Sequence, residues 1–285
     1  MNLNYIKDRE RMTEMKTADN GVAYLTFTPL NKLNCVKNAF STRVGGVSEG
    51  IYSSLNLNFN QGDDPDKVEK NFRAMAEALG ISAENMVMAH QTHTANVMKV
   101  GRENAGMGII RERSYSDVDG IVTNEKGLCL VTSHADCIPL YFVDPVKGAI
   151  GLSHSGWKGT AGNIAKNTVD LMKKEFGTSP EDVIGVIGPG ICGSCYEIGQ
   201  DVADVFIEKY AGERQAQVVK PEKGKEGKYL LDLHAANCYN MLDAGLTREN
   251  IHVSDVCTME NSELLFSHRA SKGKRGGLCA FLMIN

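Results

Sequence analysis

The chain has 285 residues, of which 42% are hydrophobic and 23% charged, and its formal net charge is −4. This composition is ordinary for a soluble globular protein, and without a surplus of basic residues it argues against a nucleic-acid partner. No apolar run approaches the about 20 residues that a membrane-spanning helix needs, and the N-terminus lacks the apolar core of a secretory signal, so we expect a cytoplasmic protein without a membrane partner.

The N-terminal part of the chain predicts little regular structure. Residues 1–20 are polar, so we expect a loose N-terminal segment followed by a single catalytic domain over 21–285. Apolar residues alternate over 21–27, which predicts a strand. Residues 40–58 are rich in glycine and serine and predict a shaped loop, with Arg43 as its single cation.

A mixture of helices and strands is predicted beyond this loop. Asp64 and Pro65 open a helix as N-cap and first helical residue, and Gly80 ends it. Further helices are predicted over 160–177, 202–210 and 232–245. Short apolar runs predict strands over 86–89, 96–100, 119–123, 128–132, 138–143, 149–153, 183–187, 229–233, 251–256 and 278–284. Because these elements do not alternate as βαβ units, we expect an α+β fold, one domain with mixed β-sheets flanked by helices.

Residues 133–159 carry many of the side chains that could bind a metal ion or take part in catalysis. They include two histidines, a cysteine, two aspartates and the only tryptophan. Asp144 and Pro145 form a turn between two predicted strands, which indicates a β-hairpin. This hairpin would bring Cys137, at the start of one strand, next to His154, at the end of the other. Such a pair can share a metal ion or act as nucleophile and base.

His93 lies between two other predicted strands and offers a third ligand. His93, Cys137 and His154 would supply the three protein ligands of a catalytic zinc ion and leave the fourth position open. By spacing alone, ordinary buried residues are the alternative, because the three lie far apart in sequence. His90 could pair with His93, but their spacing puts them on different faces, so we expect one of them to lie behind the ligands.

Two polar residues next to Cys137 are candidates for a supporting role. Asp136 precedes it directly, and His134 lies three residues before it. Either could orient a ligand or move a proton. We favour Asp136 for this role, with a purely structural turn aspartate as the alternative.

Cys192 and Cys195 form a CxxC motif, which is found in redox and metal sites. No second CxxC accompanies it, and the H-x-E part of the zinc deaminase motif is absent. The motif follows Gly188-Pro189-Gly190, so we interpret it as a loop with incidental thiols. We likewise expect the basic residues at 272–275 to form a solvated loop.

Ordered blocks of the sequence resemble the YfiH / laccase-domain family, whose members have been called polyphenol oxidases, peptidoglycan editing factors and purine nucleoside phosphorylases. The resemblance covers most of the chain beyond about residue 35. The matching blocks are FSTRVGGVSEG with SLNLN, the QTH at 91–93, VDGIVT at 118–123, ADCIP at 135–139, HSGWKGT at 154–160, IGPGI with YEIG, and FSHR at 266–269.

This resemblance implies an α+β sandwich with mixed sheets, is compatible with a homodimer, and places the family's metal ligands on His93, Cys137 and His154. The chain has Thr94 and Lys158 where the family usually has glycine and arginine. We expect Thr94 to stiffen the turn after His93, and Lys158 to keep the positive charge without the bidentate fork of arginine.

The function that the resemblance implies is a zinc-dependent purine nucleoside phosphorylase, with copper as the alternative metal. It would convert adenosine, inosine or methylthioadenosine and inorganic phosphate into the base and ribose 1-phosphate, and deaminate adenosine as a further activity. Arg43, Lys158 and Arg269 are cations in matched blocks and are candidate phosphate ligands, with surface salt bridges as the alternative. Cys137, His154 and Asp136 are the candidate catalytic residues.

Other functions are open to the same residues. Cys137 as nucleophile with His154 as base would give a cysteine hydrolase acting on peptidoglycan precursors. A copper polyphenol oxidase would need many histidines, usually in H-x-H pairs. The chain has seven histidines and no H-x-H, so this activity is disfavoured. A metal-binding partner protein without catalysis fits poorly with an open three-ligand site.

Overall fold

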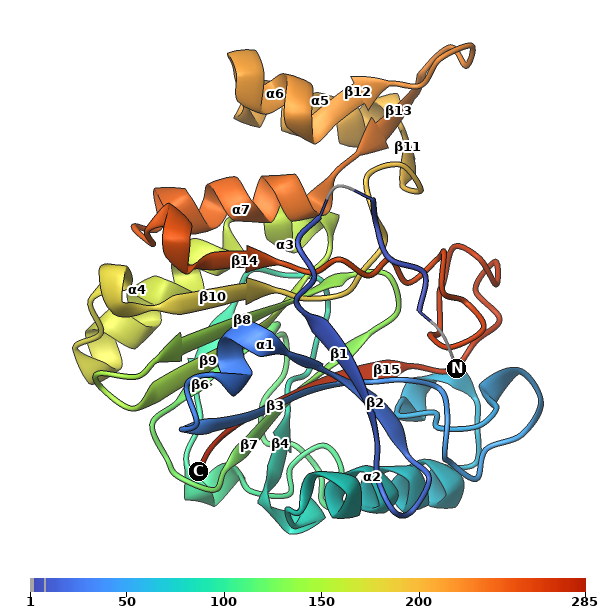
Figure 1. Cartoon of the computed structure of the whole chain (residues 1–285), viewed down its shortest axis with the longest axis vertical. Helices are drawn as coiled ribbons and strands as arrows, with labels where there is room; N and C mark the ends of the chain where they lie inside the picture. Colours follow the sequence, from blue (N-terminus) through green and yellow to red (C-terminus); the bar gives the residue numbers. More distant parts are fainter. Residues whose placement is uncertain (1–2, 8) are drawn as a thin grey trace.

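Two six-stranded β-sheets pack face to face in the computed structural model, which describes residues 3–7 and 9–285 (Figure 1). The first sheet has the spatial order β1 (Thr13–Thr17), β2 (Ala23–Phe27), β3 (Val36–Ser41), β15 (Leu278–Ile284), β7 (Cys129–His134) and β4 (Met86–Met88). The second has the order β14 (Ile251–Val253), β10 (Ile184–Ile187), β8 (Ile138–Asp144), β9 (Ala149–Ser155), β6 (Gly120–Thr123) and β5 (Val97–Lys99). Both sheets contain parallel and antiparallel pairs.

Helices cover the outer face of each sheet. The helix α2 (Pro65–Leu79) packs on the first sheet, and α4 (Ile164–Phe176) and α7 (Leu233–Asp243) pack on the second. The remaining helices are α1 (Thr28–Asn31), α3 (Trp157–Ala161), α5 (Gln200–Lys209) and α6 (Gly212–Val218), with short 3₁₀ helices at Gly50–Tyr52, Phe59–Gln61, Ala83–Asn85, Arg102–Asn104, Pro180–Asp182 and Arg248–Asn250. The predicted α+β fold with mixed sheets flanked by helices is confirmed.

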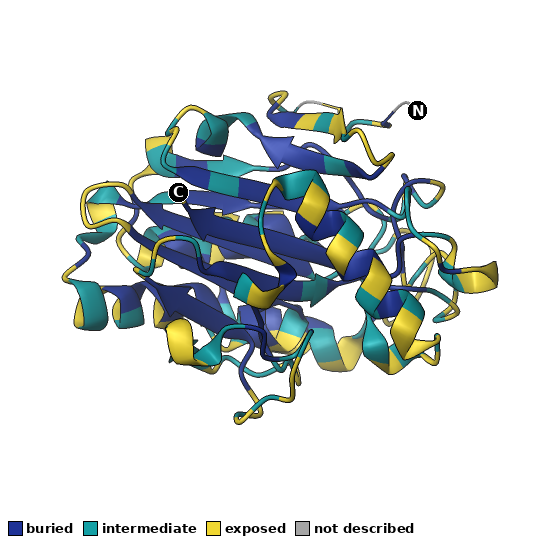
Figure 2. Ribbon diagram, turned by 90° about the horizontal axis from the view of Figure 1, so that it is seen from below, coloured by how far each residue is buried: buried dark blue, intermediate teal, exposed yellow. Residues whose placement is uncertain are grey.

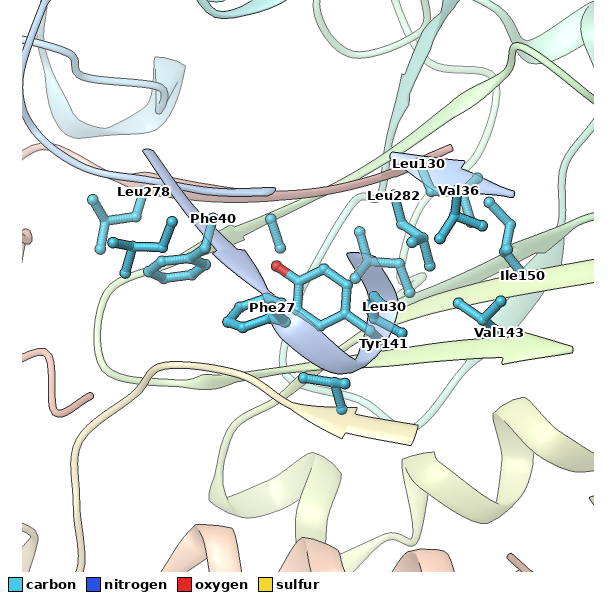
Figure 3. Close-up of a cluster of buried hydrophobic side chains, with 14 of the residues drawn as sticks. Phe27, Leu30, Val36, Phe40, Leu130, Tyr141, Val143, Ile150, Leu278 and Leu282 are labelled. Carbon is cyan, nitrogen blue, oxygen red and sulfur yellow. The ribbon is translucent and has the colours of Figure 1, made fainter. Parts of the chain in front are cut away.

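The main core lies between the two sheets. Figure 2 shows their strands buried almost throughout, while the outer helices expose one side. Tyr141 of β8 meets the ring of Phe27 edge-on, with centroids 5.1 Å apart, and its hydroxyl donates to the carbonyl oxygen of Ala39 at 2.8 Å (Figure 3). Because the buried hydroxyl has a partner, the large ring can join the two sheets without an unsatisfied polar group.

A small third sheet lies outside this sandwich. It consists of β11 (Glu197–Gly199), β13 (Lys228–Leu231) and β12 (Val219–Pro221), and together with α5 and α6 it forms the projection at the top of Figure 1. The charged residues 222–227 form the connection between β12 and β13. Tyr196, at the base of this projection, faces the cavity described below.

The prediction of a loose segment over 1–20 is wrong for its second half. Residues Thr13–Thr17 form β1, which pairs antiparallel with β2 over its whole length. Its polar sequence is compatible with an edge strand, since backbone pairing with one neighbour does not require an apolar face. Of the same segment, residues 1, 2 and 8 lie outside the described residues. In the described part of the chain no helix is long and apolar enough to cross a bilayer.

Candidate metal centre

The predicted hairpin is present and positions two of the three candidate ligands. Strands β8 and β9 are paired antiparallel with Pro139 opposite His154. Cys137, directly before β8, therefore lies beside His154 near the end of β9. His154 is only 3% exposed, so its imidazole is shielded from water within the sheet.

His93 completes the group from the segment between β4 and β5. The ligand atoms of His93, Cys137 and His154 all lie within 4.8 Å of one another. The two imidazole rings stand nearly perpendicular, at 86°, with centroids 4.9 Å apart. One thiolate and two imidazoles converging in this way form the donor set of a three-ligand site that leaves one position free.

Asp119 holds both histidines in place, a role that the sequence reasoning did not assign. Its Oδ1 accepts hydrogen bonds from Nδ1 of His154 at 2.8 Å and from the backbone N–H of His93 at 3.0 Å. Its Oδ2 accepts from the backbone N–H of Thr92 at 3.1 Å, and from the N–H and hydroxyl of Thr94, both at 2.9 Å. Because Asp119 uses Nδ1 of His154, Nε2 is the nitrogen left for a metal.

The backbone at His93 depends on this carboxylate. His93 has a φ of 65°, a left-handed conformation that is uncommon for a residue other than glycine. The N–H bonds to Asp119 fix the turn around it. Thr94, where the family usually has glycine, adds its hydroxyl to the same carboxylate, which agrees with the expected stiffening of this turn.

Electrostatic interactions inside the group favour charged forms. Burial opposes ionisation of Cys137, but the neighbouring His154 and the hydrogen bonds from both histidines outweigh it and lower the pKa of the thiol to about 6. Burial also opposes protonation of His154, yet the Cys137 thiolate and Asp119 raise its pKa to about 9. The hydrogen bond from His154 likewise overcomes burial and lowers the pKa of Asp119 to about 2.

A cavity of about 500 Å³ opens onto the three ligands. Its lining includes three arginines: Arg113, whose Nε donates to the carbonyl oxygen of Met88 at 3.0 Å, Arg269 and Arg275. The Nη1 of Arg269 donates to the carbonyl oxygen of Glu197 at 2.8 Å, and its guanidinium lies 5.1 Å from the ring centre of Tyr196. The buried Nε of Arg275 has no hydrogen-bond partner among the described residues. Because Arg275 also lines the cavity, its guanidinium is a candidate to bind an anionic ligand there.

Two of the three predicted phosphate ligands lie elsewhere. Arg43 does not line the cavity, and its Nε and Nη1 donate to the carbonyl oxygens of Ser53 and Ser262 at 2.8 and 3.2 Å. Arg43 therefore joins two loops of the scaffold. Lys158 is exposed, is absent from the cavity lining, and has its ammonium 5.6 Å from the ring centre of Trp157.

The two polar neighbours of Cys137 support the surrounding backbone. The carboxylate of Asp136 accepts from the hydroxyl of Thr258 at 2.6 Å and from the backbone N–H of Arg269 at 2.7 Å. Asp136 thus positions Arg269, and the carboxylate that orients His154 is Asp119 instead. The ring nitrogens of His134 lie 2.8 Å from the hydroxyl of Thr132 and 3.0 Å from the carbonyl oxygen of Cys137, so both are occupied.

Comparisons with known proteins agree with this architecture. Residues 37–285 match the family described as multi-copper polyphenol oxidoreductase laccase. The chain is 37% identical to purine nucleoside phosphorylase YlmD of Bacillus subtilis over 245 residues, which is 85% of this chain and 86% of that protein. It is 33% identical to adenosine deaminase RL5, from an unknown prokaryotic organism, over 84% of this chain and 93% of that protein.

The same relationship is visible in three dimensions. The crystal structure of the hypothetical protein YfiH of Bacillus licheniformis superimposes with a TM-score of 0.86 at 33% identity, and the match covers 92% of this chain and 96% of that one. The residues matched by the family, 37–285, include all three candidate metal ligands. This chain therefore belongs to the multi-copper polyphenol oxidoreductase laccase family, the YfiH-like family that its sequence blocks resemble.

Proposed function

We propose that this protein is a zinc-dependent purine nucleoside phosphorylase that also deaminates adenosine. The observation that carries the proposal is the group of His93, Cys137 and His154 at a cavity that arginine side chains also line. Relatives of similar length are named purine nucleoside phosphorylase and adenosine deaminase, which supports both reactions. The substrates would be purine nucleosides and inorganic phosphate.

The cavity has a suitable size and character for a nucleoside. Its volume of about 500 Å³ lies within the roughly 300–1,000 Å³ typical of small-molecule sites. The aromatic rings of Trp157 and Tyr196 lie in its lining together with the polar residues, and such rings suit the flat face of a purine. The ligand group and the arginines share this space, so base, ribose and phosphate can be held at once.

The chain's own residues suit a zinc ion at the ligand group. Sγ of Cys137 and one imidazole nitrogen each of His93 and His154 would bind it, and it would supply Lewis-acid polarisation of a substrate oxygen or of a water molecule. Asp119 accepts the Nδ1 proton of His154 and so keeps the lone pair of Nε2 directed toward the ligand group. It fixes His93 through the backbone, so neither imidazole must reorient when substrate binds.

Phosphate binding is assigned to Arg269 and Arg275. In phosphorolysis a phosphate oxygen forms a bond to C1′ of the ribose while the bond from C1′ to the purine nitrogen breaks, and the base leaves with the bonding electrons. Arginine forks match phosphate oxygens and hold them in a fixed orientation. Arg269 is held by the Asp136 carboxylate and the Glu197 carbonyl oxygen, and Arg275 lies in the same cavity lining, so the two can act on the same phosphate.

Two other activities use the same residues and make different demands. A cysteine hydrolase would use Cys137 as a free nucleophile, and the pKa of about 6 that His154 and His93 give this thiol suits that role as well. A thiolate bound to zinc is a poor nucleophile, so metal content separates the two functions. A copper oxidase would require copper in the purified protein and oxidation of phenols.

The deciding experiment measures metal content and phosphorolysis on the same preparation. We expect zinc in the purified protein and phosphate-dependent conversion of adenosine into adenine and ribose 1-phosphate. His93→Ala and His154→Ala should abolish this reaction, whereas His252→Ala, on β14 and outside the cavity lining, should retain it. The proposal fails if adenosine, inosine and methylthioadenosine are all stable in the presence of phosphate. Metal-free protein whose Cys137 reacts rapidly with iodoacetamide would favour the hydrolase.

A further inference from the structure

Three cysteines outside the cavity lining form a second convergent group. Cys192 and Cys195 belong to the loop before β11, and Cys257 follows β14. Their sulfur atoms all lie within 4.8 Å of one another. From the sequence we expected Cys192 and Cys195 to be incidental thiols of the loop that follows Gly188-Pro189-Gly190. The structure supplies a third sulfur from a distant part of the chain.

The backbone of both loops holds these sulfurs together. A parallel bridge joins Gly190 to Cys257, and the N–H of Cys192 donates to Sγ of Cys257 at 3.3 Å. The N–H of Cys195 donates to the carbonyl oxygen of Cys192 at 3.0 Å, which closes the turn of the CxxC motif. The sulfurs are therefore fixed by backbone bonds of both loops, as a metal site requires.

The surroundings of the sulfurs are suited to a cation. Cys192 and Cys257 are 3% and 0% exposed, and Cys195 is half-buried beside Glu260, whose Oε1 lies 3.7 Å from its Sγ. Thiols bind a metal ion as thiolates and release their protons, so three converging sulfurs beside a carboxylate can supply the negative charge that a cation requires.

We propose that Cys192, Cys195 and Cys257 bind a second zinc ion, with the carboxylate of Glu260 or a water molecule as the fourth ligand. A disulfide between Cys192 and Cys195 would use two sulfurs and leave the third without a role. Zinc, in contrast, takes three or four such ligands in structural sites. This inference does not depend on the proposed enzymatic activity, since the cysteine group shares no residue with the first centre.

The second ion would stabilise one wall of the cavity. The N–H of Ile191 donates to the carbonyl oxygen of Asp136 at 2.9 Å, and the hydroxyl of Thr258 donates to the Asp136 carboxylate at 2.6 Å. Ile191 and Thr258 are the direct neighbours of Cys192 and Cys257. An ion that joins the two loops therefore supports the segment that carries Asp136 and Cys137.

Metal stoichiometry of the full-length protein tests the proposal. We expect two zinc ions per chain in the wild type. Each of the single variants Cys257→Ser and Cys137→Ser should hold one zinc ion per chain. Cys238→Ser, a half-buried cysteine of α7 outside both groups, should keep both ions. After exchange for cobalt, Cys137→Ser should retain sulfur-to-cobalt charge-transfer absorption, and the additional Cys257→Ser change should remove it. A Cys257→Ser protein that retains both ions would overturn the proposal.

A measurement on the wild type covers the case in which the variants do not fold. Bound zinc should protect Cys195 from iodoacetamide, and removal of the metal with a chelator should expose it, as read from the mass of the modified peptide. Equal reactivity before and after chelation would contradict the proposal. So would an intact mass two hydrogens lighter than expected, if peptide mapping places the disulfide among Cys192, Cys195 and Cys257.

Discussion

Asp119 and His154 form a hydrogen bond that orients one ligand of the candidate metal centre, with Oδ1 and Nδ1 2.8 Å apart. The same carboxylate also accepts hydrogen bonds from the backbone N–H groups of His93 and Thr94. One buried side chain thus sets the tautomer of one imidazole and the backbone conformation of the other. Asp119 directly precedes β6 and binds the segment before β5. The candidate centre therefore depends on the pairing of strands in the sheet and not on a single loop.

Replacement of this carboxylate should weaken metal binding. In Asp119→Asn the side-chain amide would present N–H donors to backbone N–H groups whose hydrogen bonds the carboxylate now accepts. Loss of such a supporting partner typically lowers metal affinity by about 10–100-fold, so we expect a shift of this size in competition with a chelator, together with lower phosphorolysis. Asp117→Asn is the matched control, because Asp117 is exposed and accepts from Thr92 on the same turn. Equal affinities of Asp119→Asn and Asp117→Asn would contradict the role of Asp119.

Metal binding should require glycine at position 156, because a side chain there would crowd the ligands. A Cβ there would lie 3.1 Å from Sγ of Cys137 and 3.1 Å from Cδ2 of His93. Gly156 has a φ of −74°, which alanine also adopts, so Gly156→Ala would act through crowding alone. We expect a folded protein with reduced zinc content and little activity. Gly162→Ala crowds Ala95 and the carbonyl oxygen of Lys158 instead, and it should keep its zinc.

The hairpin with Cys137 and His154 could be predicted from the sequence, because turn residues between two apolar runs define both its strands and its ends. Asp119 could not be recognised in the same way. Its partner becomes visible only once β6 is known to pair with β9, with Gly120 opposite Ser153. This pairing joins segments that are distant in the chain, and no local pattern encodes it.

The arginines illustrate a second limit of sequence reasoning. Arg43 lies in a loop rich in glycine and serine, which suggested a ligand site. Its guanidinium instead donates to the backbone carbonyl oxygens of Ser53 and Ser262. Arg275 belongs to a basic segment that was expected to be solvated, yet its Nε is buried at the cavity. The direction of a long side chain depends on tertiary contacts, so its sequence neighbours do not determine it.

The two arginines should therefore respond differently to substitution. Charge-assisted hydrogen bonds contribute about 1.5–3 kcal/mol, so Arg275→Gln should raise KM for phosphate by roughly 10- to 100-fold, with a smaller effect on KM for the nucleoside. Arg43→Gln should leave KM for phosphate unchanged and lower the free energy of unfolding instead, because two loops lose their connection. Steady-state kinetics at varied phosphate, together with thermal denaturation, distinguish the two. A phosphate KM that rises only in Arg43→Gln would reverse the assignment.

Proton release on zinc binding should follow the two shifted pKa values of the first centre. Between about 6, the pKa of Cys137, and about 9, that of His154, the metal-free pair consists of a thiolate and an imidazolium. Zinc requires a thiolate and a neutral imidazole, so His154 must lose one proton in this range. Below pH about 6 Cys137 contributes a second, and above about 9 neither does, so zinc affinity should rise by about tenfold per pH unit between the two values.

Calorimetry in buffers of different ionisation enthalpy measures these protons directly. The Cys257→Ser protein, which lacks a ligand of the cysteine group, isolates the first centre. In His154→Ala the thiol of Cys137 loses the interactions with His154 that lower its pKa, so zinc binding should release the Cys137 proton also above pH about 6, where the wild-type thiol is already ionised. A number of released protons that stays the same from below pH about 6 to above pH about 9 would mean that Cys137 and His154 do not form an ion pair in the metal-free protein. In that case the support that Asp119 gives to the imidazolium would have to be assigned to the neutral ring alone.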